Sequence, residues 1–395
     1  MEEDVKARTE QDGWGSTVQL TYQSAIFGLP LTAALGVDYT GAALSYRIAD
    51  GRGEQFAVAT QITTHTHGGG AFFTGTVGLT ERLAVTASGR FDITSLEIKD
   101  QLANKGGKDE TDASGSHQFE RFDPAIGATY TLAPGLSAYA NYSQSYRAPT
   151  TIELTCANPQ AACPIPTALV DDPPLKPVKG KTWETGLRWS PLPNVRTTLA
   201  LFRTDLQDDI LFRNDPQSRV LGFFQNVPAT RRQGIELSLQ GTWGRGNWFA
   251  NYTLTDATFE GAIDLFTFAT TDRLERVRKG DQLPLVPNHR VNGGIEFMLT
   301  PQWRLSFDGT YVGSQYLRGD EANQHSRLDP YFVANAQIMY QANNYDIFLR
   351  FENLFDSDYE TYGAFFENTL DGTGIERFLG PGAPFGAFGG VRLRF

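Results

Sequence analysis

Two histidines separated by one residue are the clearest candidate for metal chemistry in the sequence. His65 and His67 stand directly before three glycines, Gly68 to Gly70. On an extended backbone, residues i and i+2 share a face, so the two imidazoles are placed to bind one metal ion or a haem iron. The alternative is a pair of solvated histidines in a polar loop. We predict a loop at residues 41–70, with ligand binding by His65 and His67 left open.

The chain has two cysteines, Cys156 and Cys163, seven residues apart in a proline-rich segment. In an oxidising compartment we expect them to form a disulfide that stiffens this segment. The alternative is a metal site, but neither a third cysteine nor a histidine lies nearby in the sequence. No metal centre is therefore predicted here.

Charged side chains supply two further candidates. Arg147 and Glu153 lie at the end of one expected strand, where they either contact a ligand or form an ion pair with each other. Asp320, Glu321 and Asn323 form an acidic loop whose oxygens suit weak calcium binding. A solvated surface loop is the alternative for the acidic residues.

Residues 273–279 (RLERVRK) form a basic run. It would attract an anionic ligand, such as a carboxylate-bearing molecule or the phosphates of lipopolysaccharide, although a plain charged loop is the alternative. The five histidines are scattered, and neither a Gly-x-Ser-x-Gly elbow nor a phosphate-binding glycine-rich loop occurs. The sequence therefore predicts no enzyme and no cofactor.

The composition narrows the class of protein that carries these residues. A net charge of −11 argues against a nucleic-acid partner, because phosphate binding needs a positive surface. Aromatic residues make up 12% of the 395 residues, too many for a disordered chain. No apolar run is long enough for a transmembrane helix. A membrane β-barrel survives these tests, because its strands alternate polar and apolar residues.

Alternation of polar and apolar residues recurs along the whole chain. It is clear at residues 83–94, 303–311, 345–352 and 385–395. Strict alternation over about ten residues sends one set of side chains to each face of a sheet, and a tilted strand of that length crosses a bilayer. We count about 15 such strands. Without helical crossovers between them, the sheet is expected to be antiparallel throughout.

Short and long connections alternate between these strands. Residues suited to tight turns occur at 81–82, 133–135, 191–194, 244–246, 301–302 and 343–344. Long polar segments lie at 41–70, 97–118, 148–180, 209–222, 256–288, 316–330 and 356–384. Short periplasmic turns and long extracellular loops are typical of an outer-membrane barrel. The predicted fold class is therefore an all-β antiparallel transmembrane β-barrel.

Several stretches resemble TonB-dependent outer-membrane receptors, in family order from about Tyr130 onward. They are residues 142–149 (YSQSYRAP) with 152–154 (IEL), 226–227 (NV) with 232–237 (RQGIEL), 287–292 (PNHRVN), 351–356 (FENLFD) with 358–359 (DY), and 378–384 (FLGPGAP). A last strand ending on Phe395 resembles the signal that the barrel assembly machinery reads.

The resemblance implies a receptor of the bacterial outer membrane that captures a scarce nutrient, such as a ferric siderophore, haem or cobalamin. Import would pass through a barrel of about 22 strands around a plug, energised by the TonB complex. Lipids and lipopolysaccharide of the outer membrane are further implied partners. Haem receptors resemble the chain at 147–149, but the histidine and the Asn-Pro-Asn-Leu stretch that usually follow are absent from the sequence.

The sequence departs from the family pattern in two ways. It shows about seven strands fewer than the family's barrel. Neither a plug-like segment nor a TonB box precedes the first strand, and residues 1–12 lack the features of a secretory signal. We therefore expect one partial barrel domain over 1–395, without plug or signal peptide. The alternatives are a passive outer-membrane pore or structural barrel and, third, an outer-membrane enzyme.

Overall fold

The computed structural model describes residues 4–52, 55–102, 112–157, 163–164, 175–214, 221–266, 274–368 and 374–394. They divide into two compact units, which are treated separately below. The first comprises 1–128, 141–182 and 205–230, and the second 129–140, 183–204 and 231–395. Among the described residues, no helix is long and apolar enough to cross a membrane.

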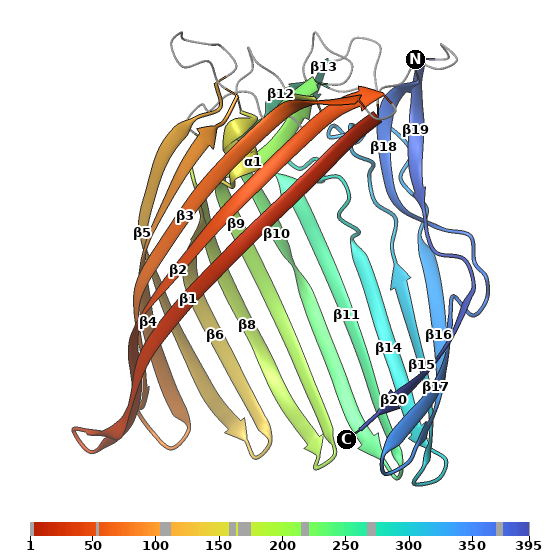
Figure 1. The fold of residues 1–395 in the computed structure, drawn as a ribbon. Helices are drawn as coiled ribbons and strands as arrows, with labels where there is room; N and C mark the ends of the chain where they lie inside the picture. Colours follow the sequence, from red (N-terminus) through yellow and green to blue (C-terminus); the bar gives the residue numbers. More distant parts are fainter. Residues whose placement is uncertain are drawn as a thin grey trace. The chain divides into compact units, whose positions relative to one another are not determined.

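Fifteen strands follow one another in a single hydrogen-bonded order, as the sequence predicts (Figure 1). The two-residue strand β7 (Cys163–Pro164) pairs with β10 beside this order. The order is β1 (Asp4–Ile26), β2 (Leu29–Arg52), β3 (Gln55–Gly78), β4 (Leu83–Asp100), β5 (Gly115–Ala133), β6 (Leu136–Arg147), β8 (Val178–Leu192), β9 (Val195–Asn214), β10 (Leu221–Trp243), β11 (Gly246–Phe259), β14 (His289–Met298), β15 (Trp303–Val312), β16 (Tyr331–Gln341), β17 (Tyr345–Glu352) and β20 (Gly386–Leu393).

The six predicted tight turns are confirmed, since each falls between two consecutive strands of this order. One further turn, between β1 and β2, was not predicted. Its two residues, Phe27 and Gly28, have φ values of 53° and 79°. Positive φ at both positions is the geometry of a two-residue hairpin, which glycine accommodates without strain. The single glycine is the only sequence signal for it.

The prediction of a loop at 41–70 is wrong. β2 and β3 form a continuous antiparallel ladder from Leu31↔Val77 to Arg52↔Gln55, with one irregularity after Ile48. A polar sequence does not end a strand here, because Thr and Tyr favour extended backbone and the ladder satisfies the backbone groups. β4, β5, β9 and β10 likewise extend into the predicted loops at 97–118 and 209–222.

Individual strands present large apolar side chains to solvent on one face. On β5, Phe122, Ile126 and Tyr130 are 51%, 56% and 43% exposed and share one parity. The opposite parity carries Arg121 and Asp123, which form an ion pair at 2.8 Å. An exposed apolar row is unfavourable in water and typical of the lipid-facing side of a barrel strand.

The core of the first unit surrounds the short helix α1 (Thr151–Thr155). Leu154 and Cys156 are fully buried and pack with Ile62, Leu96 and Ile98 from β3 and β4. This packing holds the segment after β6 against neighbouring strands.

The second unit adds two hairpins outside the strand order. They are β12 (Ile263–Phe266) with β13 (Leu274–Val277), and β18 (Glu360–Asn368) with β19 (Gly374–Pro381). They occupy the predicted long segments 256–288 and 356–384. The loop between β15 and β16 is held by buried Leu317 and Leu328, which pack against Phe365 of β18. These elements position the candidate site residues of this unit.

Candidate functional site

Arg147 and Glu153 are brought together as an ion pair. Arg147 Nη1 and Nη2 donate to the two carboxylate oxygens of Glu153 at 2.7 and 2.9 Å. Glu153 also accepts from the backbone N–H of Thr150 at 2.8 Å, while the Thr150 hydroxyl accepts from the N–H of Glu153. This capping box explains why the chain turns into α1 directly after β6. The guanidinium remains half exposed, whereas the carboxylate is largely enclosed.

Of the two cysteines, only the side chain of Cys156 lies within the described residues. Cys156 is disulfide-bonded and fully buried beside α1. The side chain of Cys163 lies outside the described residues, so the pairing of these two cysteines stays a prediction.

His65 and His67 lie within β3 and not in a loop, because the ladder with β2 continues past them. The hydroxyl of Tyr39 on β2 lies 2.7 Å from His67 Nδ1, and the two rings stack with centroids 6.2 Å apart. Opposite His65 stand Ala43 on β2 and Glu97 on β4. In the described part of the chain, neither histidine belongs to a group of three side chains able to hold a metal ion.

The glycines after the histidines do not form the expected loop. They lie in β3, and Gly70 leaves room for a side chain of the neighbouring strand. Asp38, Gly70 and Asp92 form one row across β2, β3 and β4. A Cβ on Gly70 would overlap the guanidinium of Arg90, which crosses β3 there. Arg90 Nη1 donates to Asp38 at 2.6 Å, and Arg90 Nε donates to Asp92 at 2.8 Å. Sequence reasoning missed this network because Asp38 precedes Arg90 by 52 residues, and only the strand register brings it to Arg90 and Asp92.

The basic run is partly neutralised. Arg276 lies 3.4 Å from Asp264 across the β12–β13 hairpin, and Lys279 lies 3.3 Å from Glu260. Arg273 lies outside the described residues, as does Phe395, so the assembly signal also stays a prediction.

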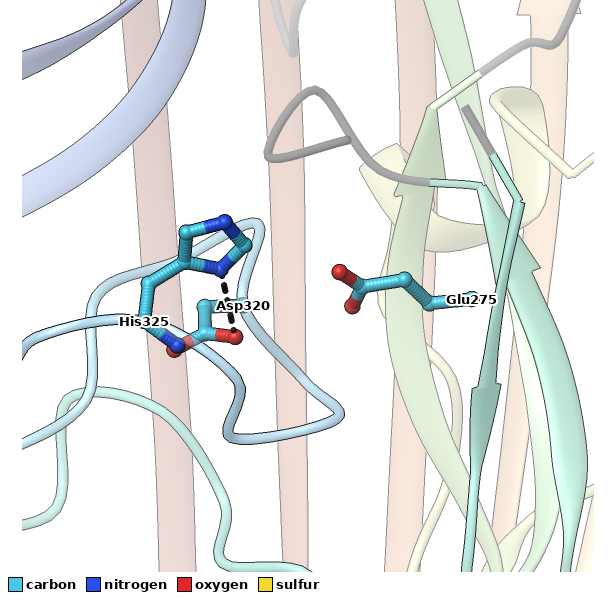
Figure 2. Close-up of side chains that lie close together, drawn as sticks. All are labelled: Glu275, Asp320 and His325. Carbon is cyan, nitrogen blue, oxygen red and sulfur yellow. Dashed lines mark hydrogen bonds and ion pairs between the residues drawn. The ribbon is translucent and has the colours of Figure 1, made fainter. Parts of the chain in front are cut away.

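Nothing in the sequence indicated a cluster that brings the basic run, residues 273–279, together with the acidic loop that contains Asp320. Glu275 of β13 faces Asp320 and His325, which lie between β15 and β16 (Figure 2). One ligand atom from each of the three side chains lies within 4.8 Å of the others. Asp320 was singled out from the sequence, but Glu275 was hidden among cations, and only the fold brings His325 to it. Asn323 is not free for an ion, because its side chain bonds the backbone of Gln282.

Two asparagines in the quoted stretches stabilise chain reversals. Asn353 is 2% exposed with φ 48°. Its amide donates to the carbonyls of Ser357 and Ala383 at 2.9 and 3.1 Å, and its oxygen accepts from the Ser357 N–H at 3.0 Å. Asn226 binds both backbone groups of Lys176, 50 residues away, at 2.8 and 2.9 Å. These motif residues therefore have structural roles.

Glycine in the stretch 232–237 also has a geometric reason. A Cβ on Gly234 would overlap the carbonyl oxygen of Leu254 on β11. The close approach of the two backbones requires glycine at this position.

Comparison with known proteins gives one family and a set of similar folds. Residues 3–354 match the family model described as TonB dependent receptor-like, beta-barrel. The ferric-catecholate import receptor Fiu from E. coli K12 (closed form) is 19% identical, with a TM-score of 0.71 over 97% of this chain and 54% of that chain. The siderophore receptor PiuA from Acinetobacter baumannii is 18% identical, with a TM-score of 0.72 over 98% and 56%.

The copper transporter OprC is also similar, at 18% identity and a TM-score of 0.71 over 99% of this chain and 58% of that chain. At sequence identities this low, the structural similarity shows that the fold is shared, and nothing further. The chain spans between 54% and 58% of the length of these three solved structures.

Proposed function

Because the chain belongs to the TonB-dependent receptor-like β-barrel family, we propose that it is the barrel portion of an outer-membrane receptor for a scarce nutrient. The proposed cargo is a ferric siderophore or a similar metal chelate. Energy would come from the TonB complex, through the whole receptor. This whole-protein activity is part of the proposal, since the chain spans just over half of the solved structures it resembles.

The observation that carries the proposal is the family match over residues 3–354. The exposed apolar rows support a place in the bacterial outer membrane, among lipid and lipopolysaccharide, after insertion by the barrel assembly machinery. The cargo class rests on weaker support. Fiu and PiuA are described as ferric-catecholate and siderophore receptors, and OprC as a copper transporter.

The proposed ligand-binding residues are Arg147, His65 and His67, with Glu153 as the partner that holds Arg147 before binding. Arg147 is half exposed although it pairs with Glu153, so an anionic cargo can compete for its guanidinium. Binding of the cargo to Arg147 would break the ion pair with Glu153, which would keep its hydrogen bond to the Thr150 N–H at the start of α1. His65 and His67 are proposed contacts on β3, where a ligand of His67 would displace the hydroxyl of Tyr39.

The test is uptake of labelled ferric siderophores, ferric citrate, haem and cobalamin by cells that carry the intact gene or its deletion. A receptor of the proposed kind gives saturable uptake of one metal chelate, and a proton-gradient uncoupler abolishes it. Uptake that does not saturate and survives the uncoupler would identify a passive pore instead. Gene-dependent hydrolysis of the substrate, without its import, would identify an outer-membrane enzyme.

A further inference from the structure

A buried carboxylate without a well-formed hydrogen bond lies in the β12–β13 hairpin. Glu275 is 3% exposed, and among the described residues neither of its carboxylate oxygens has a partner in good hydrogen-bond geometry, although the backbone N–H of Ala322 lies near enough to favour the charged form. Transfer of an unpaired carboxylate out of water is costly, so such a group needs either a proton or a cation. Burial first, and then the charges of Asp320 and Glu321, raise the pKa of Glu275 to about 7.

The side chain points toward two further ligand-type groups (Figure 2). Asp320 is fully buried, and His325 Nδ1 lies 3.2 Å from its Oδ1. The ligand atoms of the three residues lie within 4.8 Å of one another. Two carboxylates and one imidazole therefore converge on one small volume from two separate segments of the same unit.

The loop that carries Asp320 and His325 is held in place independently of Glu275. The carboxylate of Asp320 accepts the backbone N–H groups of Gln324 and His325 at 2.7 and 3.1 Å. The backbone of Arg318 bonds β18 on both sides, donating to Gly363 at 3.0 Å and accepting from Phe365 at 2.9 Å. The site is thus organised before any ligand arrives, which lowers the cost of binding.

We propose that Glu275, Asp320 and His325 bind a resident divalent transition-metal ion such as Zn²⁺. An ion of charge +2 balances the two carboxylates, and imidazole is a preferred ligand of transition metals, whereas Ca²⁺ and Mg²⁺ take oxygen ligands. The two carboxylates are buried, which suits an ion that stays and not a cargo that must leave. The ion would join β13 to the loop between β15 and β16, and this role goes beyond the proposed transport.

The test uses the 395-residue chain, purified in detergent, stripped with EDTA and dialysed. Calorimetric titration with ZnCl₂ and metal analysis after gel filtration are expected to give one ion per chain. Glu275→Gln is expected to weaken Zn²⁺ binding by at least about tenfold. The matched control is Asp264→Asn, which removes an exposed carboxylate from the paired strand β12 and is expected to leave binding unchanged.

Co²⁺ supplies a readout that does not depend on stability. Its visible absorption is expected to change on binding to the wild-type chain and to remain that of the aqueous ion with His325→Ala. Far-ultraviolet circular dichroism checks that each variant retains its strands. Equal Zn²⁺ affinity of wild type and a folded Glu275→Gln variant would overturn the proposal, as would tighter binding of Ca²⁺ than of Zn²⁺ by the wild type.

Discussion

At the scale of single residues, the family-like stretches are explained by backbone geometry more than by ligand chemistry. Asn353 satisfies backbone groups at a chain reversal, Asn226 bridges two distant segments, and Gly234 permits two strands to approach closely. Such roles are visible only once the partner is known. The sequence could identify these positions by resemblance, but it could not assign their partners, because each partner is many residues away.

Asn353→Ala is expected to lower the free energy of unfolding by about 3 kcal/mol. The substitution leaves the carbonyls of Ser357 and Ala383 without the buried amide donor of Asn353 and places alanine at positive φ. Urea unfolding in detergent, followed by tryptophan fluorescence, measures the change. Asn343→Ala, in the exposed turn before β17, is the control and should change stability by less than about 0.5 kcal/mol. Equal effects at the two positions would show that the hydrogen bonds of Asn353 do not stabilise the fold.

The raised pKa of Glu275, about 7, predicts a pH dependence of the metal-free chain. The folded state holds a proton that the unfolded state releases near the ordinary pKa of 4.5. Stability from this group is therefore present below pH 4.5 and is lost as the pH rises toward 7. The loss is about 3 kcal/mol. Urea unfolding with EDTA between pH 4.5 and 7.5 should show this loss in wild type, and Glu275→Gln should remove it. If the unfolding free energy of Glu275→Gln fell with pH as steeply as that of the wild type, the raised pKa of Glu275 would be contradicted.

At the scale of elements, turns were predictable and loops were not. Pro, Gly and Asn mark the six tight turns because they supply the backbone angles that a turn requires. The polar sequence of residues 41–70 led to a wrong prediction of a loop. The β2–β3 ladder continues there through backbone hydrogen bonds, and a strand that does not face lipid needs no row of apolar side chains. That error also misplaced His65 and His67. The short helix α1 went unpredicted, since its capping box lies inside a segment interpreted as loop.

Glu153→Ala is expected to loosen α1 without unfolding the chain. It removes both the ion pair with Arg147 and the acceptor for the Thr150 N–H, with a cost of about 1 kcal/mol for a half-exposed pair and a cap. Hydrogen exchange of the Leu154 amide, which donates to Thr150 at 3.0 Å, should become faster. Glu153→Gln keeps an acceptor and should exchange at an intermediate rate. If Glu120→Ala, an exposed control on β5, had the same effect, the assignment would fail.

At the scale of the whole molecule, the fold class, the antiparallel order and the strand number could be predicted, because each depends on a pattern repeated many times. The metal-ligand cluster could not. Glu275 belongs to a run that reads as basic, and His325 stands alone in the sequence. Their meeting depends on a hairpin and a loop that lie outside the repeated pattern.

Ile126→Arg tests whether the exposed apolar rows face lipid. A cation at the middle of the lipid-facing side costs about 2–4 kcal/mol, and the cost is small on the opposite face. Folding into phospholipid vesicles should therefore be weakened by Ile126→Arg and little changed by Thr129→Arg, which joins the face of Arg121 and Asp123. Equal effects at both positions would argue against a lipid-facing row on β5.

The length of the first strands has a consequence for the height of this part of the protein. The 23 residues of β1 extend for about 75 Å, or about 50 Å upright at the usual tilt, whereas the apolar band of a barrel is about 25 Å tall. The exposed apolar residues Val18, Leu20 and Tyr22 lie in the half of β1 next to its hairpin, and the half from Asp4 to Asp12 is polar. In a bilayer, that polar half rises as a wall beyond the headgroups. A molecule approaching from that side would meet this polar wall first, then His65, in register with Ala43 and Asp12 at its lower edge, and then His67, in register with Gly41 and Trp14.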